Sequence, residues 1–417
     1  MIPEPSCRAE HRLDYAAIPI LYHNLFAHAG DRVADSTLES GARGGHPVSP
    51  ADRSDDRGRT NPFPASSEEV TIVTGSRFSF SAMFLVLLSF GIEATSRAGD
   101  LALASPDEPR AKSLSMERAA VYLDEVALNW TRSRKCGTCH TNYAYMLSRS
   151  SIGEAGQAGA MKEIRGFFES RAEHWDDAEK EAKPKFDAEV IATAVSLAIN
   201  DGATTGKLHP TTRKALDRIW TLQREDGGFT WLKCDWPPLE HDDYYGAVFA
   251  ALGVGLAPEG YAKTEKATKG LAKLTTYLRE HPAPDLHHRT FLLWASLKID
   301  GLMTTQEREK TTNALRAIQR DDGGWSLPTL GDWKRRDGSP NPKDGPSDGY
   351  ATGLVLYVLR QADVPSRDPA IQKGVAWLAA NQRESGRWFT RSLNTDKAHY
   401  IANAGTGFAV MALAACR

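Results

Sequence analysis

The sequence predicts an all-α protein whose helices form a closed double ring. The first observation behind this prediction is an internal repeat, in which a glutamine, three spacer residues, a glycine, any residue and an aromatic residue follow one another. Its three copies are Gln223–Phe229, Gln319–Trp325 and Gln382–Trp388. Each copy follows a helical pattern, and such repetition is typical of proteins built from stacked units.

The second observation is that helical patterns of two kinds alternate from Ser113 onward. Amphipathic segments with one charged face are expected to form the outer ring. They are Leu114–Arg132, Met161–Trp175, Thr211–Arg224, Thr264–Glu280, Thr305–Arg320 and Pro369–Arg383. Apolar segments rich in small residues are expected to form the inner ring, because small residues let helix backbones pack closely. They are Asn142–Arg149, Asp187–Asn200, Asp243–Gly255, Leu286–Ile299, Asp348–Arg360 and Asn403–Ala415.

Several of these segments carry start signals. Asp368 stands before Pro369, and Thr304 with Glu307 forms a capping box. We expect Asn142, Asp243, Asp348 and Asn403 to cap four of the inner helices.

The third observation concerns the end of the chain. Gly405–Ala415 belongs to the most apolar helical pattern of all, whereas a linear stack of repeats needs polar ends. We therefore expect the last pair of helices to close against the first.

The first part of the chain has a different composition. Residues 1–77 are expected to form a disordered leader, because the stretch up to about Glu69 is rich in Arg, Asp, Ser, Gly and Pro and has no apolar period. Phe78–Ile92 is a charge-free apolar run, shorter than the ~20 residues of a membrane span. Residues 78–98 therefore resemble a secretory signal; an ordinary buried helix is the alternative.

A signal so far from Met1 suggests that translation starts near Val70 or Val73. The mature protein would then begin near Gly99 and be exported to the periplasm or the extracellular space, without a transmembrane span. The net charge of −2, from 51 basic and 53 acidic residues, argues against a nucleic-acid partner.

The repeat resembles that of the terpenoid cyclase and prenyltransferase superfamily, and of squalene–hopene cyclases in particular. The match is best in the last copy, where Lys373-Gly374 and Trp377-Leu378 precede Gln382, and it extends over about residues 113–417. The resemblance implies an (α/α)6 toroid with a central cavity suited to an isoprenoid or another apolar ligand. It also implies that the repeated glutamines and tryptophans tie each outer helix to its neighbours, so these residues are structural.

The sharpest chemical signal is Cys136-Gly137-Thr138-Cys139-His140. Two cysteines three residues apart, followed directly by histidine, form the attachment pattern of c-type haem, with the histidine as iron ligand. His241 is then a candidate distal ligand. Alternatively this loop is one turn of the repeat that holds a disulfide, or that binds zinc through Cys136, Cys139, His140 and Cys234.

A second candidate site contains the carboxylates Glu240, Asp242 and Asp243. Squalene–hopene cyclases take their initiating acid from an Asp-x-Asp-Asp motif, which Glu240-His241-Asp242-Asp243 resembles loosely. By this resemblance the three carboxylates are candidate catalytic residues of a cyclase- or mutase-like isomerase, or of a lyase. The alternative is that Asp243 caps a helix and Asp242 is solvated.

Three functions stay open at this point. The chain is an enzyme that acts on an apolar ligand, a haem-binding redox or scaffold protein, or a toroidal binding module without catalysis. His287-His288 opens another inner helix, and we expect only one of the two rings to face a cavity, because adjacent helical residues point about 100° apart.

Overall fold

The computed structural model describes residues 103–417, except 154–157, 176–184 and 235. Within these ranges the chain forms α-helices, short 3₁₀ helices and isolated β-bridges, and no β-strand. The predicted all-α class is confirmed. The predicted leader (1–77) and the signal-like segment (78–98) lie outside the described residues.

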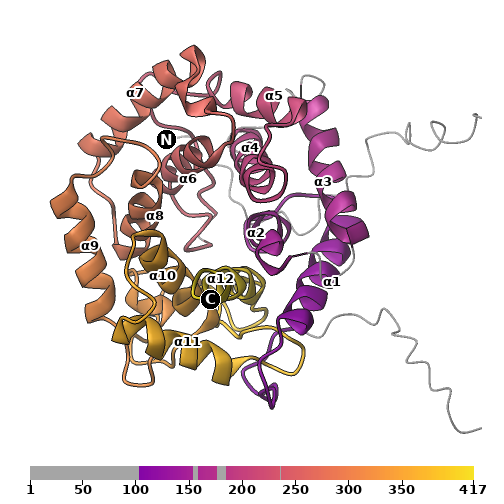
Figure 1. The fold of residues 1–417 in the computed structure, drawn as a ribbon, viewed down its shortest axis with the longest axis vertical. Coiled ribbons are helices and arrows are strands. Elements are labelled where there is room, and N and C mark those ends of the chain that lie inside the picture. The colour runs from indigo at the N-terminus through magenta and orange to yellow at the C-terminus, as the bar shows by residue number, and fades with distance from the viewer. Residues whose placement is uncertain (1–102, 154–157, 176–184, 235) are drawn as a thin grey trace, which may run out of the picture. The chain divides into compact units, whose positions relative to one another are not determined.

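Helices of two kinds alternate along the chain, as predicted. The odd-numbered helices are α1 (Met116–Arg134), α3 (Ala158–Glu173), α5 (Pro210–Ile219), α7 (Glu265–Glu280), α9 (Thr305–Ala317) and α11 (Pro369–Asn381). The even-numbered helices are α2 (Asn142–Ser148), α4 (Lys185–Thr204), α6 (Asp243–Leu256), α8 (Leu286–Ser296), α10 (Gly349–Gln361) and α12 (Ile401–Ala415). In the described part of the chain, the 3₁₀ helices η2 (Arg149–Ile152), η3 (Tyr261–Lys263) and η4 (Leu327–Thr329) lie in connections. In Figure 1 the even-numbered helices lie inside the odd-numbered ones.

The inner helices are buried almost all round, which explains their apolar composition. Every residue of α6 from Tyr244 to Val254 is buried, and so is every residue of α12 from Ala402 to Leu413. No helix in the described ranges combines the length and the apolarity that crossing a bilayer requires.

The repeated motif forms the same turn three times. The glycine at the fifth position has a positive φ in each copy: 87° in Gly227, 90° in Gly323 and 94° in Gly386. Residues other than glycine rarely adopt this backbone conformation. In the first two copies, the amide nitrogen of Gln223 or Gln319 donates to the carbonyl of that glycine and to a carbonyl of the next outer helix.

The third copy joins the two ends of the helical region. The Gln382 side chain donates to the Ser115 carbonyl at 2.8 Å and accepts from the Ser115 N–H at 2.7 Å, next to the start of α1. The Tyr122 hydroxyl on α1 donates to Asn403 on α12 at 2.6 Å, and Asn403 donates to Thr141 before α2 at 3.0 Å. The last pair of helices therefore packs against the first.

The helix caps agree only in part with the sequence prediction. Asp348, Asp368 and the Thr304–Glu307 capping box are confirmed. The other three predicted caps are wrong: Thr141 rather than Asn142 precedes α2, Asp242 rather than Asp243 caps α6, and Asn403 lies inside α12. Each shift has the same cause, because the side chain expected to cap is instead bonded to another part of the chain.

Close packing of the inner helices predicts a strong effect at Gly353 on α10. A methyl group on Gly353 would lie against the backbone of Phe408 and Ala409 on α12, so we expect Gly353→Ala to lower the free energy of unfolding by about 1–3 kcal/mol. Gly166 on α3 is the matched control, since it is helical, exposed and has nothing within 4 Å of the added methyl. Gly166→Ala should stabilise the protein by about 0.5–1 kcal/mol. Urea unfolding of both variants checks this; equal effects would contradict the packing described.

Candidate functional site

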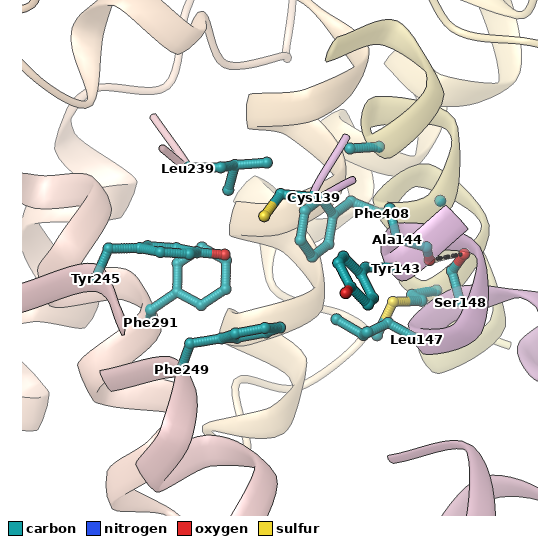
Figure 2. Close-up of a pocket in the computed structure, with 13 residues that line it drawn as sticks. Cys139, Tyr143, Ala144, Leu147, Ser148, Leu239, Tyr245, Phe249, Phe291 and Phe408 are labelled. Atoms are coloured by element: carbon teal, nitrogen blue, oxygen red, sulfur yellow. Dashed lines mark hydrogen bonds between the residues drawn. The ribbon is translucent and has the colours of Figure 1, made fainter. Parts of the chain in front are cut away.

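A small, aromatic-lined chamber lies among the inner helices. Its wall includes Tyr143 from α2, Tyr245 and Phe249 from α6, Phe291 from α8 and Phe408 from α12 (Figure 2). Cys139 also lines the chamber, from the loop that precedes α2. The free volume is about 20 Å³, enough for roughly one water molecule. The side chains therefore nearly fill this chamber.

A thiol and a carboxyl group meet at the edge of this chamber. The Glu240 carboxylate accepts hydrogen bonds from the thiol and from the backbone N–H of Cys139. A short turn holds Glu240 in place: its carbonyl accepts from the Cys234 N–H at 3.2 Å, and its N–H donates to the Trp236 carbonyl at 3.0 Å. Figure 2 shows the Cys139 sulfur directed toward the side of the chamber on which Tyr245 lies.

Burial changes the ionisation of both groups. Desolvation raises the pKa of Glu240 to about 7, although the hydrogen bonds from Cys139 oppose this shift. Desolvation, and then the neighbouring Glu240, raise the pKa of the Cys139 thiol well above its usual value. Near neutral pH the edge of the chamber therefore holds a protonated thiol and a carboxyl group that can gain or lose a proton.

Asp242 has a different environment from Glu240. Its Oδ1 caps α6 by accepting the Tyr245 N–H at 2.9 Å, and its Oδ2 lies 3.0 Å from Nε2 of His288. Burial would raise the pKa of Asp242, but the hydrogen bond and charge of His288 outweigh it and hold that pKa below its usual value. Asp242 is thus ionised, and the alternative in which it is merely solvated is wrong.

His288 lies between two carboxylates. Its Nδ1 is 2.7 Å from Oδ1 of Asp285, the cap of α8, and its other ring nitrogen faces Asp242. Burial opposes protonation, but Asp242 and Asp285 together raise the pKa of His288 to about 9. The adjacent His287 behaves in the opposite way, because burial and then the charge of His288 lower its pKa to about 3.

Asp243, the third predicted carboxylate, is held in structural contacts. It lies 2.8 Å from Nη1 of Arg224 and 3.5 Å from Nζ of Lys233, and it accepts the Trp231 N–H at 2.9 Å. These contacts tie the turn of the first repeat copy to the start of α6. The three carboxylates thus have different roles. Glu240 can be protonated near neutral pH, Asp242 is an ionised helix cap, and Asp243 forms a structural salt bridge.

The Cys-x-x-Cys-His loop is held by the side chain of Asn142. Asn142 accepts the Thr138 N–H at 2.8 Å and donates to the Cys136 carbonyl at 3.0 Å. His140 stacks on Tyr400, with ring centroids 5.3 Å apart, and meets Trp130 edge-on at 5.0 Å. The loop is therefore an ordered turn that connects α1, α2 and α12.

Cys136 and Cys139 lie in different surroundings within this turn. The Cys136 thiol lies near Trp130, whereas the Cys139 thiol meets Glu240 at the chamber. Within the described ranges, Cys136, Cys139, Cys234 and Cys416 form no disulfide. Among the described residues, no three of the proposed zinc ligands Cys136, Cys139, His140 and Cys234 bring their ligand atoms within 4.8 Å of one another.

A haem bound at this loop would require the surrounding side chains to rearrange. A haem attached to Cys139 would need space beside its sulfur, where the chamber has room for about one water molecule. The His140 ring, the expected iron ligand, packs against two aromatic rings. His241, the candidate distal ligand, is partly buried and acts electrostatically on Asp242.

Part of this site was not predicted from the sequence. From the sequence we expected only one of the rings of His287 and His288 to face a cavity; both rings are buried, and neither lines the chamber. The prediction did not include Asp285 or Tyr350, whose hydroxyl lies 2.9 Å from Nε2 of His287. An aspartate two residues before a histidine pair, at the start of a predicted helix, is the signal that could have identified Asp285.

Comparison with known proteins adds no family assignment. No protein-family model matches the chain, and no curated protein matches it significantly.

Proposed function

We propose that residues 113–417 form an (α/α)6 toroid of the terpenoid-cyclase type and act as a cyclase- or mutase-like isomerase on an apolar, isoprenoid-like ligand. The observation that carries this proposal is the position of Glu240, whose carboxyl group meets Cys139 at the edge of an aromatic chamber and whose pKa burial raises to about 7. The alternation of inner and outer helices and the contact between the first and last pairs support the toroid.

In the proposed reaction Glu240 transfers its proton to one carbon of an alkene. The positive charge then resides on the neighbouring carbon, and the Glu240 carboxylate keeps its hydrogen bonds from Cys139. Return of a different proton from the ligand to Glu240 yields an isomer and restores the acid. A general acid needs a pKa near the working pH, which Glu240 has.

The aromatic wall suits the cation that this step creates. The faces of Tyr245, Phe249, Phe291 and Phe408 carry negative quadrupole charge and stabilise a nearby cation. The ionised Asp242 adds a negative charge that acts on Tyr245, one of these rings. Because the free volume is about 20 Å³, ligand entry requires the lining side chains to move apart.

This proposal is tested by incubating the protein with neutral acyclic isoprenoids such as farnesol and squalene and analysing the extract by mass spectrometry. An isomer that forms in proportion to protein supports the enzyme. A ligand that binds tightly but returns unchanged would favour the non-catalytic binding module. If the protein neither binds nor converts these compounds, the proposed ligand class is wrong.

The shifted pKa of Glu240 predicts a pH dependence of stability. The folded protein holds the Glu240 proton up to about pH 7, whereas the unfolded chain loses it near pH 4.5. Stability that is present below pH 4.5 is therefore lost as the pH rises to about 7, by up to about 3 kcal/mol. Glu240→Gln removes this loss, so the variant should gain stability relative to the wild type across that range. The free energy of unfolding is measured with urea at several pH values for both proteins. If it changes with pH in the same way in the wild type and in Glu240→Gln, the raised pKa of Glu240 is wrong.

We also propose that the chain is exported, on the composition of residues 78–98. One intact-mass measurement tests export and haem together, on protein produced with its own leader in a host that matures c-type cytochromes. We expect a mature chain that begins near Gly99 and has the mass of the polypeptide alone, because the ring of His140, the expected iron ligand, packs between Trp130 and Tyr400. A mass increased by one haem, with a haemochrome spectrum, would make the haem-binding alternative correct.

A further inference from the structure

Three groups with metal-ligating atoms meet at the start of α8. Asp285, His287 and His288 each place one such atom within 4.8 Å of the other two. Both imidazoles are buried, with 1% or less of their surface exposed, and the Asp285 side chain is 14% exposed. Two imidazoles and one carboxylate form a ligand set that is typical of zinc and of other divalent transition metals.

His287 has one ring nitrogen without a partner. Nε2 of His287 lies 2.9 Å from the Tyr350 hydroxyl, but Nδ1 is buried and has no hydrogen bond. If Nε2–H donates to Tyr350, Nδ1 carries a lone pair. An unpaired polar atom in a fully buried ring is costly, and a metal ion would satisfy it.

His288 is placed as a metal-ligating histidine usually is. Its Nδ1 lies 2.7 Å from Asp285, and its Nε2 lies 3.0 Å from Asp242, although that contact does not have the geometry of a hydrogen bond. A histidine that binds metal through one nitrogen commonly donates the other N–H to a carboxylate, which fixes the orientation of the ring. Asp242 occupies that outer position for His288, as Tyr350 does for His287.

The charges in this cluster also favour a cation. Asp242 and Asp285 contribute two negative charges, so the cluster carries −1 with His288 protonated and −2 with it neutral. The groups that act most strongly on both carboxylates are histidines. Buried negative charge that is not fully compensated is stabilised by metal coordination.

We propose that Asp285, Nδ1 of His287 and Nδ1 of His288 bind one divalent transition metal ion of the zinc type. The ion takes the place of the proton between His288 and Asp285, and that proton is released on binding. Three protein ligands leave a fourth position for water or a ligand atom. The site lies next to the chamber wall, since Tyr245 contacts the rings of both His287 and His288.

The experiment is a Co²⁺ titration of chelator-stripped protein, followed by the visible absorption of the bound ion and repeated with Zn²⁺ as competitor. We expect one saturable site per chain. His287→Gln and Asp285→Asn should each weaken binding at least about tenfold. Asn can still cap α8, so Asp285→Asn is expected to fold. His281→Gln is the control, because His281 is an exposed histidine that stacks on Tyr277 and lies outside the cluster.

Two further measurements distinguish loss of metal binding from loss of the fold and from metal binding by cysteines. Circular dichroism of the metal-free variants must show wild-type helix content, and added Zn²⁺ should raise the unfolding temperature of the wild type and of His281→Gln only. Ligation by Cys136, Cys139 and Cys234 would instead give near-ultraviolet thiolate bands that are lost in Cys139→Ser. Those bands, the lack of a saturable site, or unchanged binding by both cluster variants would each overturn the proposal. None of these measurements depends on turnover of an isoprenoid.

Discussion

Replacing Trp388 by alanine is expected to lower the free energy of unfolding by about 3–5 kcal/mol. The ring of Trp388 is fully buried, and its Nε1–H donates to the Leu378 carbonyl at 2.8 Å. Gly349 at the start of α10 has no side chain, which leaves space for Trp388 to pack against its backbone. The alanine variant therefore loses both a large buried surface and a buried hydrogen bond.

Urea unfolding followed by circular dichroism measures this loss. Trp130→Ala is the matched control, because Trp130 is a partly exposed tryptophan outside the repeated motif. We expect the control to be less destabilised than Trp388→Ala. If the two variants are equally stable, the last copy of the motif does not hold the ends of the helical region together.

The second large effect is expected for Glu240→Gln. Glutamine keeps the size of the side chain and can still accept hydrogen bonds from Cys139, but its amide is not an acid that can protonate an alkene. We expect formation of the isomer to fall by about 10²-fold or more, the usual contribution of a general acid, while helix content stays the same.

Asp243→Asn is the control for Glu240→Gln. Both residues belong to the same acidic string, but the Asp243 carboxylate is engaged by Arg224 and Lys233. This variant should lose some stability and keep its rate within a factor of a few. If the rate falls in Asp243→Asn and not in Glu240→Gln, Glu240 is not the general acid.

The positions of the helices were predictable from the sequence, because each depends on local patterns. Apolar and charged periods located the helices, and the glycine of each repeat copy marked the turn that follows an outer helix. The caps were less predictable. Two adjacent aspartates, Asp242 and Asp243, are equivalent locally, and only the positions of His288 and Arg224 decide which one caps α6.

The candidate site was predictable only in its separate parts. Glu240 and Cys139 were both singled out, but for different sites, since about a hundred residues separate them in the chain. Their contact depends on how the loops that precede α2 and α6 come together in the fold. The same holds for Asp242 with His288 and for His287 with Tyr350, whose partners come from different inner helices. Side chains that meet only through tertiary packing have no characteristic spacing in the sequence, so the sequence alone does not pair them.

The most direct test of the proposed function is isotope uptake during the reaction. The wild type and Glu240→Gln are incubated with an acyclic isoprenoid in D₂O, and the products are analysed by gas chromatography and mass spectrometry. We expect the wild type to form an isomer carrying deuterium at carbon and Glu240→Gln to form almost none. A product without deuterium, or equal formation by both proteins, would show that Glu240 is not the proton donor.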